Sequence, residues 1–265
     1  MKKRISSFLL WINIPLSAAA WIAMGLLTLF IVMAGFFVFI VSTPFDWRYR
    51  SLMHFIARVW AKSILFAVPF WRLNVSGLEN IPPGKKPYVI VANHLSLIDI
   101  LVLLSGLNRS FKFMAKKELF SVPFMGWHMA LTGYIPVDRK SAQSSYAAMR
   151  KAMQWIRKGV SVVFFPEGTR SRSGQIQPFK IGAFKVAQEA GVMILPVVLY
   201  GTRDALPKKS WIIRRASRFH LSVGKPVEVQ PGANHEEALL GLRDRIRKEM
   251  ADRLDRLKQE DRHRK

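Results

Sequence analysis

The sequence contains no cysteine and few acidic residues. Without cysteine, the chain has no disulfides, no thiolate catalysis and no cysteine-based zinc site. Its 41 lysines and arginines outnumber its 17 aspartates and glutamates, which gives a formal net charge of +24. A chain this basic is expected to meet an anionic partner, such as a nucleic acid, lipid head groups or an acidic soluble cofactor.

Charge of either sign is missing from a long stretch near the N-terminus. No charged residue occurs from Ile5 to Phe45, a run far longer than the roughly 20 residues that span a bilayer as a helix. A signal peptide has an apolar region of only about 7–15 residues. The cluster Met1-Lys2-Lys3-Arg4 and a cleavage-like Ala18-Ala19-Ala20 would suit such a peptide, but the length predicts a retained membrane anchor. The anchor favours lipid over nucleic acid as the anionic partner.

The uncharged run is too long for one steep crossing, because as a straight helix it would measure about 60 Å. Pro15, Gly25 and Gly35 are places where a helix can break or bend. Lysines and arginines lie on both sides of the run, and these residues prefer the cytoplasmic side of a membrane. We therefore expect a hairpin, or a pair of helices sunk into one leaflet, with the following domain on the cytoplasmic face.

Three regions are predicted: membrane-anchoring helices over 1–68, an α/β domain over 69–230 and an amphipathic basic helix over 231–265. In the middle region, short apolar runs alternate with helical stretches, which predicts a mainly parallel sheet with flanking helices. The expected strands are 71–75, 88–92, 111–115, 133–137, 160–165, 193–199 and 219–223. The expected helices of this domain are 97–104, 118–131, 141–158 and 183–190, after an amphipathic helix at 49–67.

The first chemically informative stretch is Asn93-His94-Leu95-Ser96-Leu97-Ile98-Asp99. Five residues along a helix turn by about 500°, so the two side chains would point about 140° apart if both were helical. They meet only if His94 lies in the turn before the helix and Asp99 lies on its first or second turn. A histidine held by a carboxylate is a general base with a fixed tautomer. A buried structural histidine beside an ordinary helix-start aspartate is the alternative, and these residues alone favour neither.

The second stretch is Phe165-Pro166-Glu167-Gly168-Thr169-Arg170-Ser171. It follows an apolar strand and presents two hydroxyls, a guanidinium and backbone N–H groups, which suit an anionic oxygen cluster such as a phosphate. The alternative is that Glu167 and Arg170 only brace the loop.

Together the two stretches resemble the glycerolipid acyltransferase family, specifically the 1-acylglycerol-3-phosphate (lysophosphatidate) acyltransferases. Four further segments are similar to the family pattern and follow in the family's order: 113–119, 133–139, 178–184 and 194–197. The resemblance covers about residues 87–201, so it includes neither the uncharged run nor the C-terminal helix. One departure is Pro136, where the family more often has an apolar or aromatic residue.

The resemblance implies direct acyl transfer from acyl-CoA or acyl-carrier protein to the free hydroxyl of lysophosphatidic acid, giving phosphatidic acid. His94 would be the general base and Asp99 would orient it, with backbone N–H groups of the turn at 93–96 helping to hold the oxyanion. The acceptor would be bound by Glu167, Gly168, Thr169 and Arg170, the last on its phosphate. Positive charge would be added by Lys116, Lys117 and Arg139, although a structural ion pair is the alternative for Arg139. No metal and no cofactor are implied, since the acyl donor is a co-substrate.

Other readings remain. The acceptor could be another lysophospholipid or an amino-acid-based lyso-lipid. A protein of a different class, a non-catalytic basic membrane adaptor or a nucleic-acid binder, is disfavoured because no nucleic-acid module occurs. The absence of a Gly-x-Ser-x-Gly elbow fits a reaction without a protein nucleophile. The basic and apolar loop at 206–215 would suit lipid head groups with Trp211 at the interface, an acidic carrier protein, the phosphates of CoA, or solvent alone.

Overall fold

The computed structural model describes residues 7–46, 48, 50–68, 71–84, 86–213, 217–229 and 235–263. Two helices, α1 (Ser7–Asp46) and α2 (Ser51–Ala67), precede an α/β domain. The strands are β1 (Trp71–Ser76), β2 (Val89–Ala92), β3 (Phe111–Lys116), β4 (Ile135–Val137), β5 (Ser161–Phe164), β6 (Ile194–Tyr200) and β7 (Ser217–Val223). The later helices are α3 (Ile98–Gly106), α4 (Met125–Thr132), α5 (Ala142–Arg157), α6 (Gly182–Ala190), α7 (Thr202–Ala205) and α8 (His235–His263). Two short 3-10 helices, η1 (Leu78–Asn80) and η2 (Lys117–Ser121), complete the set.

The strands form one seven-stranded sheet in the order β1-β7-β6-β2-β5-β3-β4. All neighbouring pairs are parallel except β6 and β7, which are antiparallel. This confirms the predicted α/β class with a mainly parallel sheet. Because β6, β2, β5 and β3 are parallel, their carboxyl ends meet at one edge, which is where sites form in such sheets.

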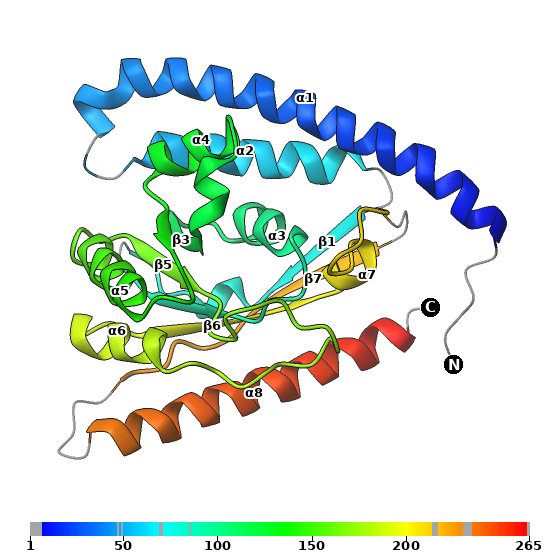
Figure 1. Ribbon diagram of the computed structural model, residues 1–265. Coiled ribbons are helices and arrows are strands. Elements are labelled where there is room, and N and C mark those ends of the chain that lie inside the picture. The colour runs from blue at the N-terminus through cyan, green and yellow to red at the C-terminus, as the bar shows by residue number, and fades with distance from the viewer. Residues whose placement is uncertain are drawn as a thin grey trace.

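Helices cover both faces of the sheet (Figure 1). On one face, α2, α3 and α4 pack with β2 side chains such as Ile90 and Ala92, and α1 lies outside them. On the other face, α5, α6 and α8 pack with Val89 and Val91 of the same strand. A strand buried on both sides must be apolar at every position, and this explains the unbroken run Val89-Ile90-Val91-Ala92.

Helix α1 is one continuous helix, so the expected break at Pro15, Gly25 or Gly35 is wrong. A proline removes one hydrogen bond and bends a helix without having to end it. At Gly35, α1 lies against α2 and α4, since an added Cβ would be in van der Waals contact with Ile56 Cγ2 at 3.5 Å and with His128 Nδ1 at 3.6 Å. The hairpin or pair of helices expected within the uncharged run is therefore not formed, and α2 follows the run as a separate helix.

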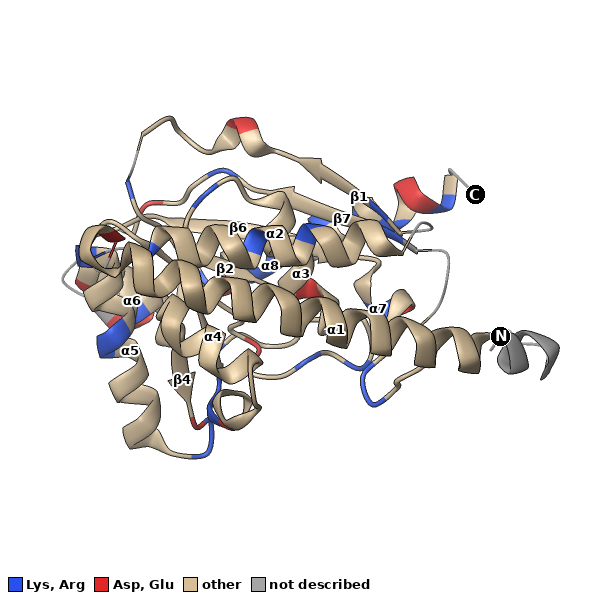
Figure 2. Cartoon of the chain, turned by 90° about the horizontal axis from the view of Figure 1, so that it is seen from above, with Lys and Arg blue, Asp and Glu red and all other residues tan. Residues whose placement is uncertain are grey.

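Over Asn13–Asp46, α1 is long and apolar enough to cross a membrane by length and composition. Its outer side is strongly apolar, since Phe30 and Phe37 are 72% and 69% exposed. Viewed from above, it carries no lysine, arginine or glutamate before its final residue, Asp46 (Figure 2). One apolar N-terminal helix is therefore available to anchor the chain in a membrane.

The expected helix at 118–131 is two pieces, η2 and α4. Pro123 separates them, and Phe124 follows with a φ of 62°, a conformation that interrupts a right-handed helix. The C-terminal helix, α8, lies within the predicted 231–265 and docks by one apolar face, through Leu239, Ile246, Met250, Leu254 and Leu257.

Candidate active site

His94 and Asp99 lie at the carboxyl end of β2, in the arrangement that their spacing predicts. His94 occupies the turn and Asp99 the first turn of α3, and their Nδ1 and Oδ2 atoms are 2.8 Å apart. Asp99 is fully buried. Its Oδ2 also accepts hydrogen bonds from the backbone N–H groups of Leu95 and Ser96, at 2.6 and 2.9 Å. The carboxylate therefore shapes the turn and holds the imidazole at the same time.

The His94 ring is fixed from a second direction by Phe165. The two rings stack with their centroids 4.1 Å apart and their planes 21° apart. Among the described residues, His94 Nε2 has no hydrogen-bond partner, and the side chain is 11% exposed. With Nδ1 held by a carboxylate, the neutral ring carries its free lone pair on Nε2, so this nitrogen is a basic atom open to a ligand.

The second stretch is tied directly to the first, because β5 and β2 are adjacent parallel strands. Glu167 Oε1 accepts from the His94 N–H at 2.8 Å, and Oε2 accepts from the Gln177 N–H at 3.0 Å. The Ser171 N–H donates to the His94 carbonyl at 2.8 Å. The described contacts of Glu167 therefore brace the loop, which was the alternative to acceptor binding. Burial raises the pKa of Glu167 to about 7.

The expected oxyanion donors are not free. The N–H of His94 is bound to Glu167, and those of Leu95 and Ser96 are bound to Asp99. These three N–H groups thus form hydrogen bonds that hold the turn at 93–96 in place. The expectation that they hold the oxyanion is wrong.

Cations surround the loop at 168–171 from two sides. On one side, a guanidinium nitrogen of Arg139 donates to the Gly168 carbonyl, and a Cβ added at Gly168 would lie 3.3 Å from Lys180 Nζ. On the other side, Lys208 Nζ donates to Thr169 Oγ1 and to the Arg170 carbonyl, each at 2.9 Å. Arg139 thus braces the loop by a hydrogen bond to backbone.

Several cationic side chains in and near the loop at 168–171 have no described carboxylate partner. Within the described part of the chain, no carboxylate pairs with Arg170, Arg172, Lys208 or Lys209. Partial burial and the neighbouring Arg172 and Arg170 lower the pKa of Lys208. Mutual repulsion of this kind is relieved by an anion, so the loop is suited to bind one.

The other expected cations lie near the end of β3. Lys116 Nζ is 2.9 Å from Glu118 Oε1, and both side chains are well exposed. Lys117 is exposed at the start of η2. Neither has a described contact with the loop at 168–171, so their part in binding the acceptor remains a prediction.

Thr202 is a site residue that the sequence reasoning missed. Its Oγ1 donates to Asp99 Oδ1 at 2.5 Å, and both residues are fully buried. Next to it, Ser96 Oγ donates to the Leu206 carbonyl at 2.8 Å. The sequence does contain a pattern that points to Thr202. It is a hydroxyl residue directly after Gly201 at the end of a predicted strand, and parallel sheets place their sites at such strand ends.

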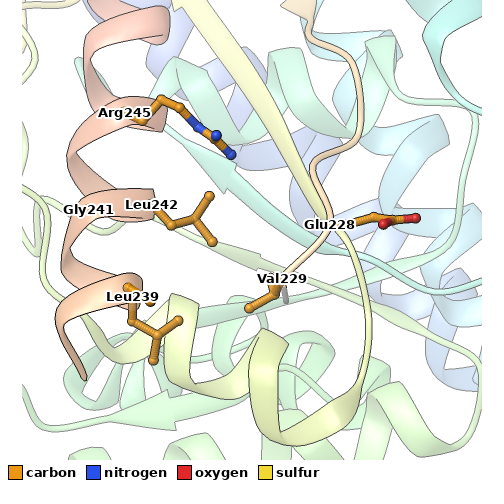
Figure 3. Close-up of a pocket in the computed structure, with 7 residues that line it drawn as sticks. Glu228, Val229, Leu239, Gly241, Leu242 and Arg245 are labelled. Carbon is orange, nitrogen blue, oxygen red and sulfur yellow. The ribbon is translucent and has the colours of Figure 1, made fainter. Parts of the chain in front are cut away.

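A cavity of about 270 Å³ lies away from this edge, between α8 and the segment before it (Figure 3). Its lining includes Glu228, Val229 and Leu242. The nearby Val227 pairs with Ile194 at the start of β6, whereas His94 follows the end of β2. The cavity is therefore at the opposite end of the strands from the candidate site. Within the described residues, no group of three or more His, Cys, Asp or Glu side chains is placed to hold a metal ion.

The fold and this strand-end site define a class of protein. The sequence model of the family described as Acyltransferase matches residues 72–200, a range that contains both stretches but not Thr202, Lys208 or Lys209. The chain is similar to a chloroplastic 1-acyl-sn-glycerol-3-phosphate acyltransferase of Arabidopsis thaliana, at 41% identity over 183 residues. That alignment covers 69% of this chain and 51% of the relative.

A 1-acyl-sn-glycerol-3-phosphate acyltransferase of Borreliella burgdorferi is 34% identical over 181 residues, which is 68% of this chain and 72% of that protein. The crystal structure of the 1-acyl-sn-glycerophosphate acyltransferase PlsC from Thermotoga maritima superposes with a TM-score of 0.73, at 29% identity. It covers 90% of this chain and 98% of that one. The chain therefore belongs to the 1-acyl-sn-glycerol-3-phosphate acyltransferase family. It spans about half the length of several of these relatives, 51%, 52% and 55% of the plant and algal proteins.

Proposed function

We propose that this protein is a membrane-bound acyltransferase that makes phosphatidic acid. It moves a fatty acyl group from acyl-CoA or acyl-carrier protein to the free hydroxyl of 1-acylglycerol-3-phosphate. The observation that carries the proposal is the His94–Asp99 pair, with Nε2 open beside a loop of unneutralised cations. The names of the relatives support the same acceptor.

The chemistry follows from the free atom of His94. Nε2 takes the proton of the acceptor hydroxyl as that oxygen attacks the thioester carbonyl carbon. The new carbon–oxygen bond forms, the carbon–sulfur bond breaks, and the proton passes from the imidazolium to the leaving thiolate. Asp99 stabilises the imidazolium that exists between these steps, the base–orienter relation of serine hydrolases without a protein nucleophile.

The cationic loop accounts for the acceptor's phosphate. Arg170 offers a planar guanidinium that matches phosphate oxygens bidentately, and Lys208 holds the backbone and hydroxyl on either side of it. We assign the phosphate to Arg170, with Thr169 and the Gly168 backbone beside it. Because α1 supplies an apolar anchor and lysines flank the uncharged run, the catalytic edge lies at the cytoplasmic surface of the membrane.

The first experiment measures thiol release from acyl-CoA by the purified full chain in mixed micelles. Release should depend on added lysophosphatidate in the wild type. It should fall about 10²–10⁴-fold in His94→Ala, which is the usual contribution of one general base. His263→Ala, at the exposed end of α8, is the matched control and should retain full activity. Wild-type release without lysophosphatidate, or activity that survives His94→Ala, would overturn the mechanism.

The same assay, with a panel of lyso-lipid acceptors and both donor types, separates the remaining readings. Arg170→Ala should lose activity severely with a phosphate monoester acceptor and much less with an amino-acid-based lyso-lipid. Arg256→Ala on the exposed face of α8 controls for loss of one positive charge. An equal loss with both acceptors would show that Arg170 does not bind the phosphate.

A further inference from the structure

The loop after α7 lies against the apolar helix α1. Trp21 Nε1 of α1 donates to the Trp211 carbonyl at 2.7 Å, and the Ile213 N–H donates to Ser17 Oγ at 2.9 Å. The Trp211 side chain nevertheless remains 49% exposed, and Lys209 is exposed beside it. An exposed tryptophan with a neighbouring lysine is the pairing that proteins place at the membrane–water interface.

A second segment, 121–127, has the same features further along α1. Val122, Phe124 and Trp127 are 40%, 37% and 57% exposed, and the Phe124 and Trp127 rings meet edge to face at 5.1 Å. Lys117 is exposed shortly before the segment. The helix that begins in this segment touches α1 at Gly35, where an added Cβ would lie 3.6 Å from His128 Nδ1. The two contact points on α1 are 14 to 18 residues apart, about 25 Å along the helix.

Sheet topology places these two segments on either side of the candidate active site. One follows β6 through α7, and the other follows β3. Between β6 and β3 in the sheet lie β2 and β5, whose carboxyl ends carry His94 and the loop at 168–171. Figure 2, which looks down on α1, shows lysines and arginines gathered in loops along the side of α1 away from α2.

Both segments also contain an unfavourable backbone conformation. Lys209 has a φ of 69° and Phe124 a φ of 62°, and among the described residues only Arg50 shares this feature outside glycine. Strain of this kind is found where the surrounding structure requires a particular side-chain direction, often at functional positions. The two positions are a lysine in one segment and an aromatic residue in the other, and each segment contacts α1.

We infer that segments 121–127 and 207–211 form two interfacial contacts that seat the catalytic edge on a lipid bilayer containing anionic lipid. Trp127 and Trp211 lie among the head groups, and Lys209 binds lipid phosphate. Both segments contact α1, whose outer side is apolar, and tryptophan and lysine are favoured where such an apolar surface meets the head groups. Through Lys208, the second segment also holds Thr169 and Arg170 at the level of lipid phosphates.

The absence of cysteine allows a direct test on the full chain. Single cysteines at Trp127, Trp211, Phe37 and Arg256 are labelled with an environment-sensitive fluorophore. Each labelled protein is reconstituted in phosphatidylcholine vesicles, with or without phosphatidylglycerol, that carry a nitroxide on the head group or at the end of the acyl chain. The readout is lipid contact, so it does not depend on acyl transfer. Variants that melt below the wild type are replaced by labels at Val122 or Ser210.

Labels at 127 and 211 should be quenched more by head-group nitroxides than by acyl-chain nitroxides. The label at 37, on the outer side of α1, should show the reverse, and the label at 256, on α8, should show neither. Labels at 127 and 211 that behave like the one at 256 would overturn the inference, because the segments would then face water. Stronger acyl-chain quenching would overturn it too, because the segments would lie in the hydrocarbon.

The role of Lys209 is tested in the protein that carries the fluorescent label at residue 211. Lys209→Gly removes the charge at a φ that glycine adopts freely, so the loop conformation is kept. Phosphatidylglycerol should increase the quenching of this label in the wild-type background and should have little effect in Lys209→Gly. Lys248→Ala, on the exposed face of α8, is the matched control. An undiminished phosphatidylglycerol effect in Lys209→Gly would show that Lys209 does not bind the anionic lipid.

Discussion

At the residue scale, the site depends on how fully Asp99 is satisfied. The carboxylate accepts four hydrogen bonds, from His94 Nδ1, two backbone N–H groups and the Thr202 hydroxyl. A buried charge is tolerated only when its lone pairs are bound in this way. Thr202 is therefore a positioning residue that acts on His94 through Asp99.

Thr202→Val removes one of these four bonds without changing the side-chain shape. We expect kcat for acyl transfer to fall about tenfold, equivalent to about 1.4 kcal/mol in the barrier, with KM for both substrates unchanged. Thr202→Ser keeps the hydroxyl that donates to Asp99 Oδ1 and should restore kcat. The measurement is steady-state kinetics of the folded variants. A fall in kcat that Thr202→Ser does not restore, or a rise in KM in place of a fall in kcat, would contradict the positioning role.

Glu167 gives a prediction on stability and pH. Burial raises its pKa from 4.5 to about 7, so between these values the folded state binds more protons than the unfolded state. The free energy of unfolding should therefore fall as pH rises from about 5 to 7, by at most about 3 kcal/mol, and then level off. Thermal unfolding in detergent across this pH range should show wild type losing stability relative to Glu167→Gln, which cannot titrate. Glu237→Gln on α8 is the control, and parallel curves for wild type and Glu167→Gln would contradict the prediction.

At the scale of the elements, Gly35 marks the place where α1 packs against α2 and α4. A Cβ at Gly35 would already lie 3.5 Å from Ile56 and 3.6 Å from His128. Gly25 lies in the same helix, and an added Cβ there would meet nothing within 4 Å. The same substitution at either glycine changes helix propensity by the same amount. Only the substitution at Gly35 also changes the packing of α1 against α2 and α4.

Gly35→Leu should destabilise the fold by about 1–3 kcal/mol, because the extra carbons overfill the contact. Gly25→Leu gains the same helix propensity and points into open space, so it should not lower stability. The measurement is the melting temperature in detergent micelles, which should fall by several degrees in the first variant alone. Equal melting temperatures would mean that α1 is not held against α2 and α4 as described.

At the scale of the whole molecule, positive charge is concentrated away from α8. Residues 235–263 contain eight lysines and arginines and eight aspartates and glutamates, so α8 is formally neutral. Residues 1–234 contain 31 basic and nine acidic residues, a net charge of +22. The part of the chain that contains α1 and the candidate site therefore has the positive charge for the proposed binding to anionic lipid, an attraction that falls off within a Debye length of the membrane surface.

The two informative stretches were enough to predict which strand ends form the site. His94 and the loop at 168–171 each follow an apolar strand, and parallel strands place such ends at one edge of the sheet. The function of Glu167 was not predictable in the same way. Its partners are the N–H groups of His94 and Gln177, and the first of these contacts requires that β2 and β5 be neighbours in the sheet. The spacing of apolar residues does not reveal the order of the strands in the sheet. The sequence therefore could not decide whether Glu167 braces the loop or binds the acceptor.

The sequence by itself determined the alternation of strands and helices, the apolar N-terminal helix and the turn that joins His94 to Asp99. These features follow from local conformational preference and from which side chains avoid water, and both are legible in a periodic pattern. Only the tertiary structure decided that Thr202, 103 residues later, completes the hydrogen bonding of Asp99, and that two exposed tryptophans lie at the flank of α1. Contacts between distant segments depend on strand order and helix packing, which follow from the free energy of the whole fold rather than from any one stretch.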